Sequence, residues 1–166
     1  MKLTTTTTRN WAEDILRQLG DPAGHTLEVT VPPADPEPEA PPGETAFTSR
    51  LEIQYGEGPT EPSAAARHVS SVLVALAFDD GSATSVLLED SMTEAEAVAL
   101  LAEQLQDGVL EHTGGAPAPP CPGHRHPAVA EVVDGVASWT CPQGGRDGQH
   151  GRTRPVITGA AGHTTR

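Results

Sequence analysis

Aromatic side chains are scarce in this chain of 166 residues, which has two Trp, two Phe and one Tyr. Leu, Ile, Val and Phe together number 31, or about 19% of the chain, just under the level at which a highly charged sequence is expected to be disordered. Gly and Pro add 33 more residues. These counts exclude a large aromatic core, and we expect a small aliphatic core with long flexible stretches around it.

Long hydrophobic runs are also missing. The segment from Met1 to Asn10 contains a run of five Thr and lacks the apolar region of a secretory signal. The longest mostly apolar stretch, residues 69–78, is about half as long as a membrane-spanning helix. We therefore expect a soluble, cytoplasmic protein with no membrane partner. The single Lys and the single Asn indicate a GC-rich bacterial genome.

The charge is strongly one-sided, because 23 acidic residues face 10 basic ones and the formal net charge is −13. The imbalance is confined to residues 1–120, with 20 acidic and 5 basic residues, whereas residues 121–166 have 3 and 5. An Ala- and Pro-rich joint at 116–120 lies at this change and predicts a module boundary. We expect an acidic domain over 1–115, a hairpin module over 116–142 and a disordered tail over 143–166.

Spacing of apolar residues predicts the elements of the first domain. Asn10 and Glu13 match a capping box and predict a helix that ends at Gly20. Alternation predicts strands over 26–31 and from Phe47 to Tyr55, separated by a disordered, Pro-rich acidic loop over 32–45.

A hairpin and a second helix follow. Strands over 69–78 and 84–88 flank a turn with an Asp-Gly pair. Thr93 and Glu96 form a second capping box, which predicts a helix over 93–107 that is capped by Gly108. This order of elements predicts an α+β fold, in which a small antiparallel sheet of about four strands lies against two helices.

The second module contains both cysteines of the chain. The sequence predicts a hairpin over 129–133 and 136–140 across an Asp-Gly turn. Three potential metal ligands, Cys121, His124 and His126, precede this hairpin, and Cys141 follows it. In a reducing compartment, two cysteines are more typical of a metal site or of free thiols than of a disulfide. Hairpin closure would bring these ligand types to one end, as a tetrahedral zinc site requires.

The segment over 121–145 resembles a zinc ribbon, in which two metal-binding knuckles are joined through a hairpin. Cys121-Pro-Gly-His124 resembles the first knuckle, and Cys141-Pro-Gln-Gly144-Gly resembles the second. Gly144 stands where a fourth ligand is expected, so His126 is the nearest replacement and His150 is a second candidate. The alternative is a metal-free segment in which the histidines are merely solvated. The predicted metal ligands are Cys121, His124, His126 and Cys141, and the implied cofactor is zinc.

Three functions remain open. The first is a non-enzymatic, zinc-stabilised accessory or protein-interaction module with a protein partner. The second is a nucleic-acid-associated regulator that uses the basic C-terminal segment, although the acidic body would repel a polyanion. The third is a small zinc-dependent enzyme, for which only Glu131 and Asp134 lie near as general bases, and both are typical of strand and turn positions.

Overall fold

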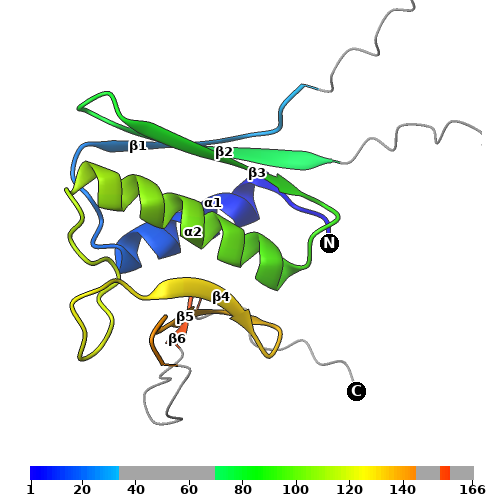
Figure 1. Cartoon of the computed structure of the whole chain (residues 1–166). Coiled ribbons are helices and arrows are strands. Elements are labelled where there is room, and N and C mark those ends of the chain that lie inside the picture. The colour runs from blue at the N-terminus through cyan, green and yellow to red at the C-terminus, as the bar shows by residue number, and fades with distance from the viewer. Residues whose placement is uncertain (34–69, 145–153, 158–166) are drawn as a thin grey trace, which may run out of the picture. The chain divides into compact units, whose positions relative to one another are not determined.

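The computed structural model describes residues 1–33, 70–144 and 154–157. Residues 1–32 and 69–166 belong to one compact unit. Within it, the two helices lie between two small antiparallel sheets (Figure 1). None of the helices among the described residues is long and apolar enough to cross a membrane. The elements are α1 Thr5–Gln18, β1 His25–Thr30, β2 Ser71–Phe78, β3 Ala83–Glu89, α2 Glu94–His112, β4 Val129–Val133, β5 Val136–Thr140 and β6 Arg154–Pro155.

The first sheet is an antiparallel meander in the order β1-β2-β3. Its central strand β2 alternates buried and less buried residues, because one face lies on the core and the other faces away from it. The predicted hairpin is present, and the turn between β2 and β3 is closed by Asp80, which accepts a hydrogen bond from the Ser82 backbone N–H at 2.9 Å. The predicted strand from Phe47 to Tyr55 and all of the predicted loop beyond residue 33 lie outside the described residues.

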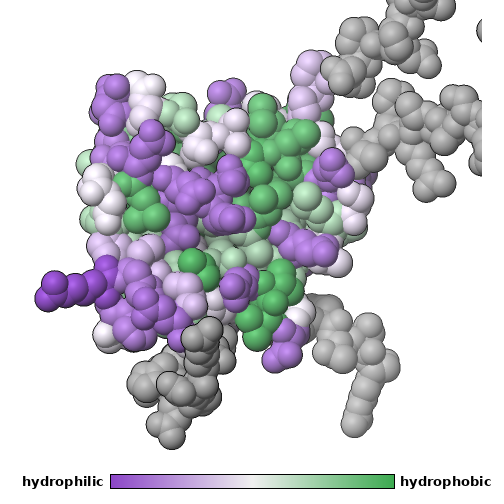
Figure 2. All heavy atoms as spheres, viewed as in Figure 1, coloured by the Kyte–Doolittle hydropathy of each residue, from purple (hydrophilic) through white to green (hydrophobic). Residues whose placement is uncertain are grey.

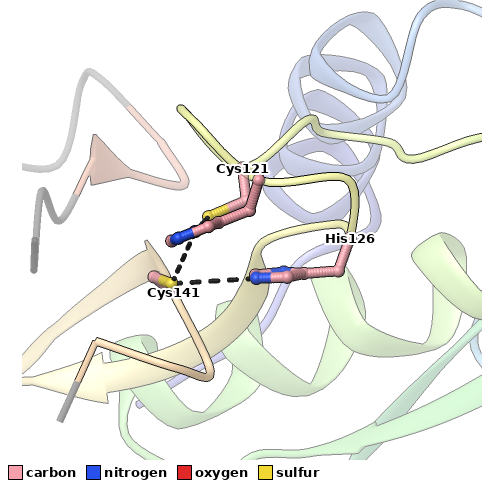
Figure 3. A group of neighbouring side chains, drawn as sticks. Cys121, His126 and Cys141 are labelled. Carbon is pink, nitrogen blue, oxygen red and sulfur yellow. Dashed lines mark hydrogen bonds between the residues drawn. The ribbon is translucent and has the colours of Figure 1, made fainter. Parts of the chain in front are cut away.

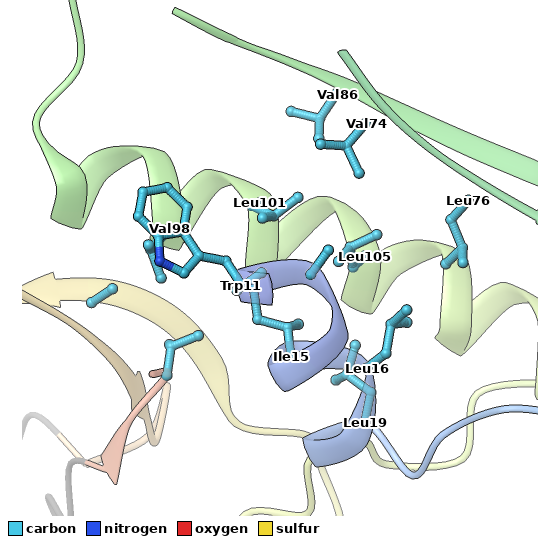
Figure 4. Close-up of a cluster of buried hydrophobic side chains, with 14 of the residues drawn as sticks. Trp11, Ile15, Leu16, Leu19, Val74, Leu76, Val86, Val98, Leu101 and Leu105 are labelled. Carbon is cyan, nitrogen blue, oxygen red and sulfur yellow. The ribbon is translucent and has the colours of Figure 1, made fainter. Parts of the chain in front are cut away.

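An aliphatic core fills the space between this sheet and the helices (Figure 4). Trp11, Ile15 and Leu16 project from α1, while Leu101 and Leu105 project from α2. The sheet contributes Val74, Leu76 and Val86, among others. The mixed α+β class is thus confirmed. Among the described residues, the first sheet has three strands and the hairpin over 129–140 belongs to a second three-stranded sheet, while the predicted fourth strand of the first sheet, Phe47 to Tyr55, lies outside these residues.

Helix α1 begins earlier than predicted. The predicted cap, Asn10, lies inside the helix, and Thr4 is the observed N-cap, whose side chain accepts a hydrogen bond from the Thr7 backbone N–H at 3.2 Å. A Thr hydroxyl can satisfy an unpaired N–H of the first turn, so the Thr run supplies its own cap. Thr8 is then buried one turn before Trp11 and Ala12.

Helix α2 ends later than predicted. Its capping box is present, since the Thr93 side chain accepts from the Glu96 N–H and the Glu96 carboxylate accepts from the Thr93 N–H. Gly108, however, is a buried residue within the helix and not its C-cap, which is Thr113. A Cβ at Gly108 would lie 2.6 Å from Cγ2 of Thr84 on β3. Gly108 therefore permits close helix–sheet packing and does not end the helix.

The second sheet has the order β4-β5-β6. Strands β4 and β5 occupy the predicted positions and pair across Asp134 and Gly135. Strand β6 lies in the tail that was predicted to be disordered over 143–166, so this prediction is wrong for residues 154–157. The reason is Val156, which is 0% exposed and whose N–H donates to the Ala137 carbonyl at 2.9 Å.

The second sheet packs against α2 on the side opposite the first sheet (Figure 1). Ala137 and Trp139 of β5 belong to the same hydrophobic cluster as the helix residues. Segments on both sides of the predicted boundary at residue 115 thus contribute side chains to one core.

Candidate metal centre

A short loop carries three of the predicted ligands. At its base, an isolated antiparallel bridge joins Pro120 to Pro127, and the Ala128 N–H donates to the Pro119 carbonyl at 2.9 Å. Closer to the tip, the Cys121 N–H donates to the His126 carbonyl at 3.2 Å. The tip reverses direction at Gly123, whose φ of 81° favours glycine. We call residues 119–128 the ligand loop.

The fourth predicted ligand comes from the end of β5. Cys141 directly follows Thr140, and its carbonyl accepts from the Gly144 N–H at 3.0 Å in a turn. Because β4 begins just after the ligand loop and pairs with β5 in antiparallel register, Val129 lies opposite Thr140. The hairpin therefore returns Cys141 to the ligand loop, as the sequence predicted.

The four side chains converge. One donor atom from each of Cys121, His124, His126 and Cys141 lies within 4.8 Å of the others. Nδ1 of His124 lies 3.4 Å from the Cys121 sulfur and 3.3 Å from the Cys141 sulfur, and Nε2 of His126 lies 3.9 Å from the Cys141 sulfur (Figure 3). Neighbouring N and S ligands of a tetrahedral zinc ion are about 3.6 Å apart. Two thiols and two imidazoles at these separations fit zinc in both donor chemistry and spacing.

The two cysteines differ in their surroundings. Cys121 is 4% exposed, whereas Cys141 is half-buried. Burial, followed by the hydrogen bond and the charge of Cys141, raises the pKa of the Cys121 thiol. A metal ion must therefore displace a firmly held proton at Cys121, and binding becomes coupled to pH.

The two histidines present different ring nitrogens to the thiols. Their rings stack, with centroids 4.9 Å apart and planes 19° from parallel. Nδ1 of His126 lies 2.9 Å from the Pro127 carbonyl, which fixes a proton on Nδ1 and leaves Nε2 free to face Cys141. His124 instead presents Nδ1. A carbonyl that holds the second nitrogen of an imidazole is a common feature of metal-binding histidines.

The sequence also offered His150 as a ligand, Gly144 at the position of a fourth ligand, and Glu131 and Asp134 as bases. His150 lies outside the described residues, and Gly144 brings no ligand atom. Of the two candidate bases, Glu131 accepts a hydrogen bond from the Thr140 hydroxyl at 3.0 Å, and Asp134 occupies the β4–β5 turn with a φ of 51°. Both have the strand and turn roles that their positions predicted.

Two glutamines that sequence analysis did not single out hold the site in place. Gln106 of α2 binds the base of the ligand loop, and Gln18 of α1 binds the indole of Trp139. Gln106 lies four residues after Ala102 and three before Val109, on an otherwise apolar helix face. A polar residue on an apolar helix face is the signal by which Gln106 could have been found in the sequence.

Comparison with known proteins finds no family model, no curated protein and no solved structure that matches this chain.

Proposed function

We propose that this protein is a non-enzymatic, zinc-stabilised accessory module that binds a protein partner, with Cys121, His124, His126 and Cys141 as the zinc ligands. One observation carries the proposal, namely the convergence of four donor atoms of the zinc type within 4.8 Å. They come from two segments, the ligand loop and the end of β5, so one ion would join both. In this view the hairpin is a zinc-ribbon-like structure.

A structural role for the metal is favoured over a catalytic one. Structural zinc sites are closed by four protein ligands, whereas catalytic sites keep one position open for water. Four side chains are available here, and neither Glu131 nor Asp134 belongs to the cluster that they form. The proposal therefore assigns no reaction to the site.

A protein partner is favoured over nucleic acid. The net charge of −13 would oppose binding to phosphates. On the face seen in Figure 2, hydrophilic side chains predominate and apolar side chains form smaller patches between them. Val132 of β4 and Val136 of β5 are among the exposed large hydrophobic residues, at the tip of the hairpin that carries Cys141. Val132 pairs with Ala137 and Val136 pairs with Val133, so the two valines lie on opposite faces of the hairpin. We propose the hairpin tip, which they flank on its two faces, as the surface for partner contact.

Metal content tests the proposal directly. Protein purified from zinc-supplemented cultures should contain about one zinc per chain by elemental analysis. Cys121→Ser and Cys141→Ser should each lower this ratio strongly, because each removes a thiolate. His112→Ala is the matched control, since His112 pairs with Asp80 and is not one of the four ligands. Metal-free wild-type protein, or equal zinc content in all variants, would refute the zinc assignment.

The partner assignment has a separate test. Affinity-tagged protein expressed in its native host should co-purify a specific partner, identified by mass spectrometry, and Val132→Asp with Val136→Asp should abolish the interaction. Leu87→Asp is the control, since Leu87 is exposed on the other sheet. Binding to DNA or RNA with a steep salt dependence would instead favour the nucleic-acid function.

A further inference from the structure

The side chain of Gln106 on α2 contacts the chain at both ends of the ligand loop. Its Nε2 donates to the carbonyl of Ala118 at 2.7 Å and to the carbonyl of Ala128 at 2.6 Å. Ala118 precedes the loop and Ala128 ends it, so the Gln106 Nε2 atom binds the chain at both ends of the loop. Gln106 itself is 5% exposed and belongs to the buried face of α2.

The chemistry of this contact is specific to a primary amide. Two carbonyl oxygens can be bridged by one nitrogen only if it carries two hydrogens. A carboxylate has no hydrogen to donate, and an ammonium group would place a charge in a buried position, which is unfavourable. Gln is the side chain that supplies a neutral NH₂ group at this reach from the helix.

Gln18 of α1 has an equivalent role on the other ligand-bearing segment. Its Oε1 accepts hydrogen bonds from Nε1 of Trp139 and from the Arg154 guanidinium, each at 3.0 Å, and its Nε2 donates to the Val156 carbonyl. Trp139 lies two residues before Cys141 on β5. Each helix therefore provides one glutamine, and each glutamine holds one of the two segments that carry the ligands.

We infer that Gln106 and Gln18 are positioning residues of the metal centre and that they couple zinc binding to the packing of the two helices. The inference rests on the proposed zinc site. A loop that is held at both ends loses less conformational freedom when the metal binds, so its affinity for zinc is higher than that of a free loop. By linkage, zinc must then stabilise the helices and not the hairpin alone.

Zinc affinity in two variants provides the first test. Gln106→Met and Gln18→Met keep the length of the side chain and remove its hydrogen bonds. Competition with a chromophoric chelator should show zinc binding weakened by about 10- to 100-fold, the range typical for partners that orient metal ligands. Gln104→Met is the matched control on the same helix and should bind zinc like the wild type. Leu101→Ala, which weakens the core without touching the hydrogen bonds of Gln106, corrects for any effect of lower stability alone.

Hydrogen exchange provides a readout that a purely structural glutamine would not change. In the wild type, added zinc should slow exchange in residues 101–109 of α2 as well as in residues 119–142. In Gln106→Met, zinc should still slow exchange in the hairpin, but the additional protection of α2 should be lost.

The outcomes separate the two proposals. Failure of the wild type to bind zinc would overturn the proposed zinc site, and this inference with it. Normal zinc binding by the wild type, together with unchanged affinity in Gln106→Met and Gln18→Met, would overturn only the inference. Zinc-induced protection restricted to residues 119–142 in the wild type would also overturn it, and would favour an independent hairpin module.

Discussion

Replacing Gly108 by Ala tests a close helix–sheet contact of the fold. In α2, the new Cβ would lie 2.6 Å from Cγ2 of Thr84, 3.3 Å from Cβ of Thr84 and 3.8 Å from Cε2 of Phe78. The first separation is shorter than van der Waals contact, and Thr84 cannot move freely because β3 pairs with β2 at Leu76. The helix or the strand must therefore shift.

Two opposing effects set the magnitude. At an unobstructed helix position, Gly→Ala would stabilise the protein by about 1 kcal/mol, because Ala has the higher helix propensity. Overpacking a tight core costs about 1 to 3 kcal/mol. The sum predicts that Gly108→Ala destabilises the fold by roughly 0 to 2 kcal/mol. Thr84→Ser removes the obstructing methyl group, so Gly108→Ala in that background should be neutral or stabilise by up to about 1 kcal/mol.

A double-mutant cycle measures the coupling between Gly108→Ala and Thr84→Ser. It requires urea unfolding of the wild type, both single variants and the double variant. The expected coupling between the two positions is up to about 1 to 3 kcal/mol, which is the overpacking cost that Thr84→Ser relieves, with unchanged m-values. If Gly108→Ala alone raised the free energy of unfolding by about 1 kcal/mol and showed no coupling to Thr84, α2 would not approach β3 as described.

Three further predictions concern the core, the hairpin turn and the metal. Leu101→Ala should lower the free energy of unfolding by about 2 to 4 kcal/mol, and Leu110→Ala by clearly less, because Leu101 is fully buried and Leu110 is half-buried; equal losses in urea unfolding would contradict this. Hydrogen bonds from the hydroxyl and the N–H of Ser82, and then from His112, lower the pKa of Asp80 from 3.8 to about 2. The stabilisation by Asp80 should thus be present above about pH 4 and decline as the pH falls toward 2, and the difference in urea midpoint between wild type and Asp80→Asn should shrink over that range. Zinc affinity should fall by about tenfold or more for each pH unit below neutrality, because binding displaces the thiol protons; an affinity that does not change with pH would exclude thiolate ligands.

Features that depend on neighbours along the chain could be predicted from the sequence. The capping box of Thr93 and Glu96 and the turn at Asp134 and Gly135 were both located correctly, because their hydrogen bonds and backbone angles involve residues within a few positions. The prediction failed at Asn10, which also matches a capping box. Two candidate caps were present there, and the observed one is Thr4, whose hydroxyl accepts a hydrogen bond from the Thr7 N–H.

The site shows the same division. Cys121, His124, His126 and Cys141 were chosen as candidate ligands from residue type and spacing, and the hairpin predicted across the Asp134-Gly135 turn implied that they would converge, as they do in the structure. The sequence left open whether His126 or His150 would be the fourth ligand. Only the folded loop places His126 beside Cys141, with its other nitrogen held by the Pro127 carbonyl.

The amino-acid sequence by itself determined the local elements, the acidic character and the candidate ligands of this protein. Tertiary structure decided the role of Gly108, the order of the segment around Val156 and the contacts of Gln106. The physical reason is the same in each case. The partners of these residues, among them Thr84 and Ala137, are far away in the sequence, and no pattern of neighbouring residues specifies which distant surfaces pack together.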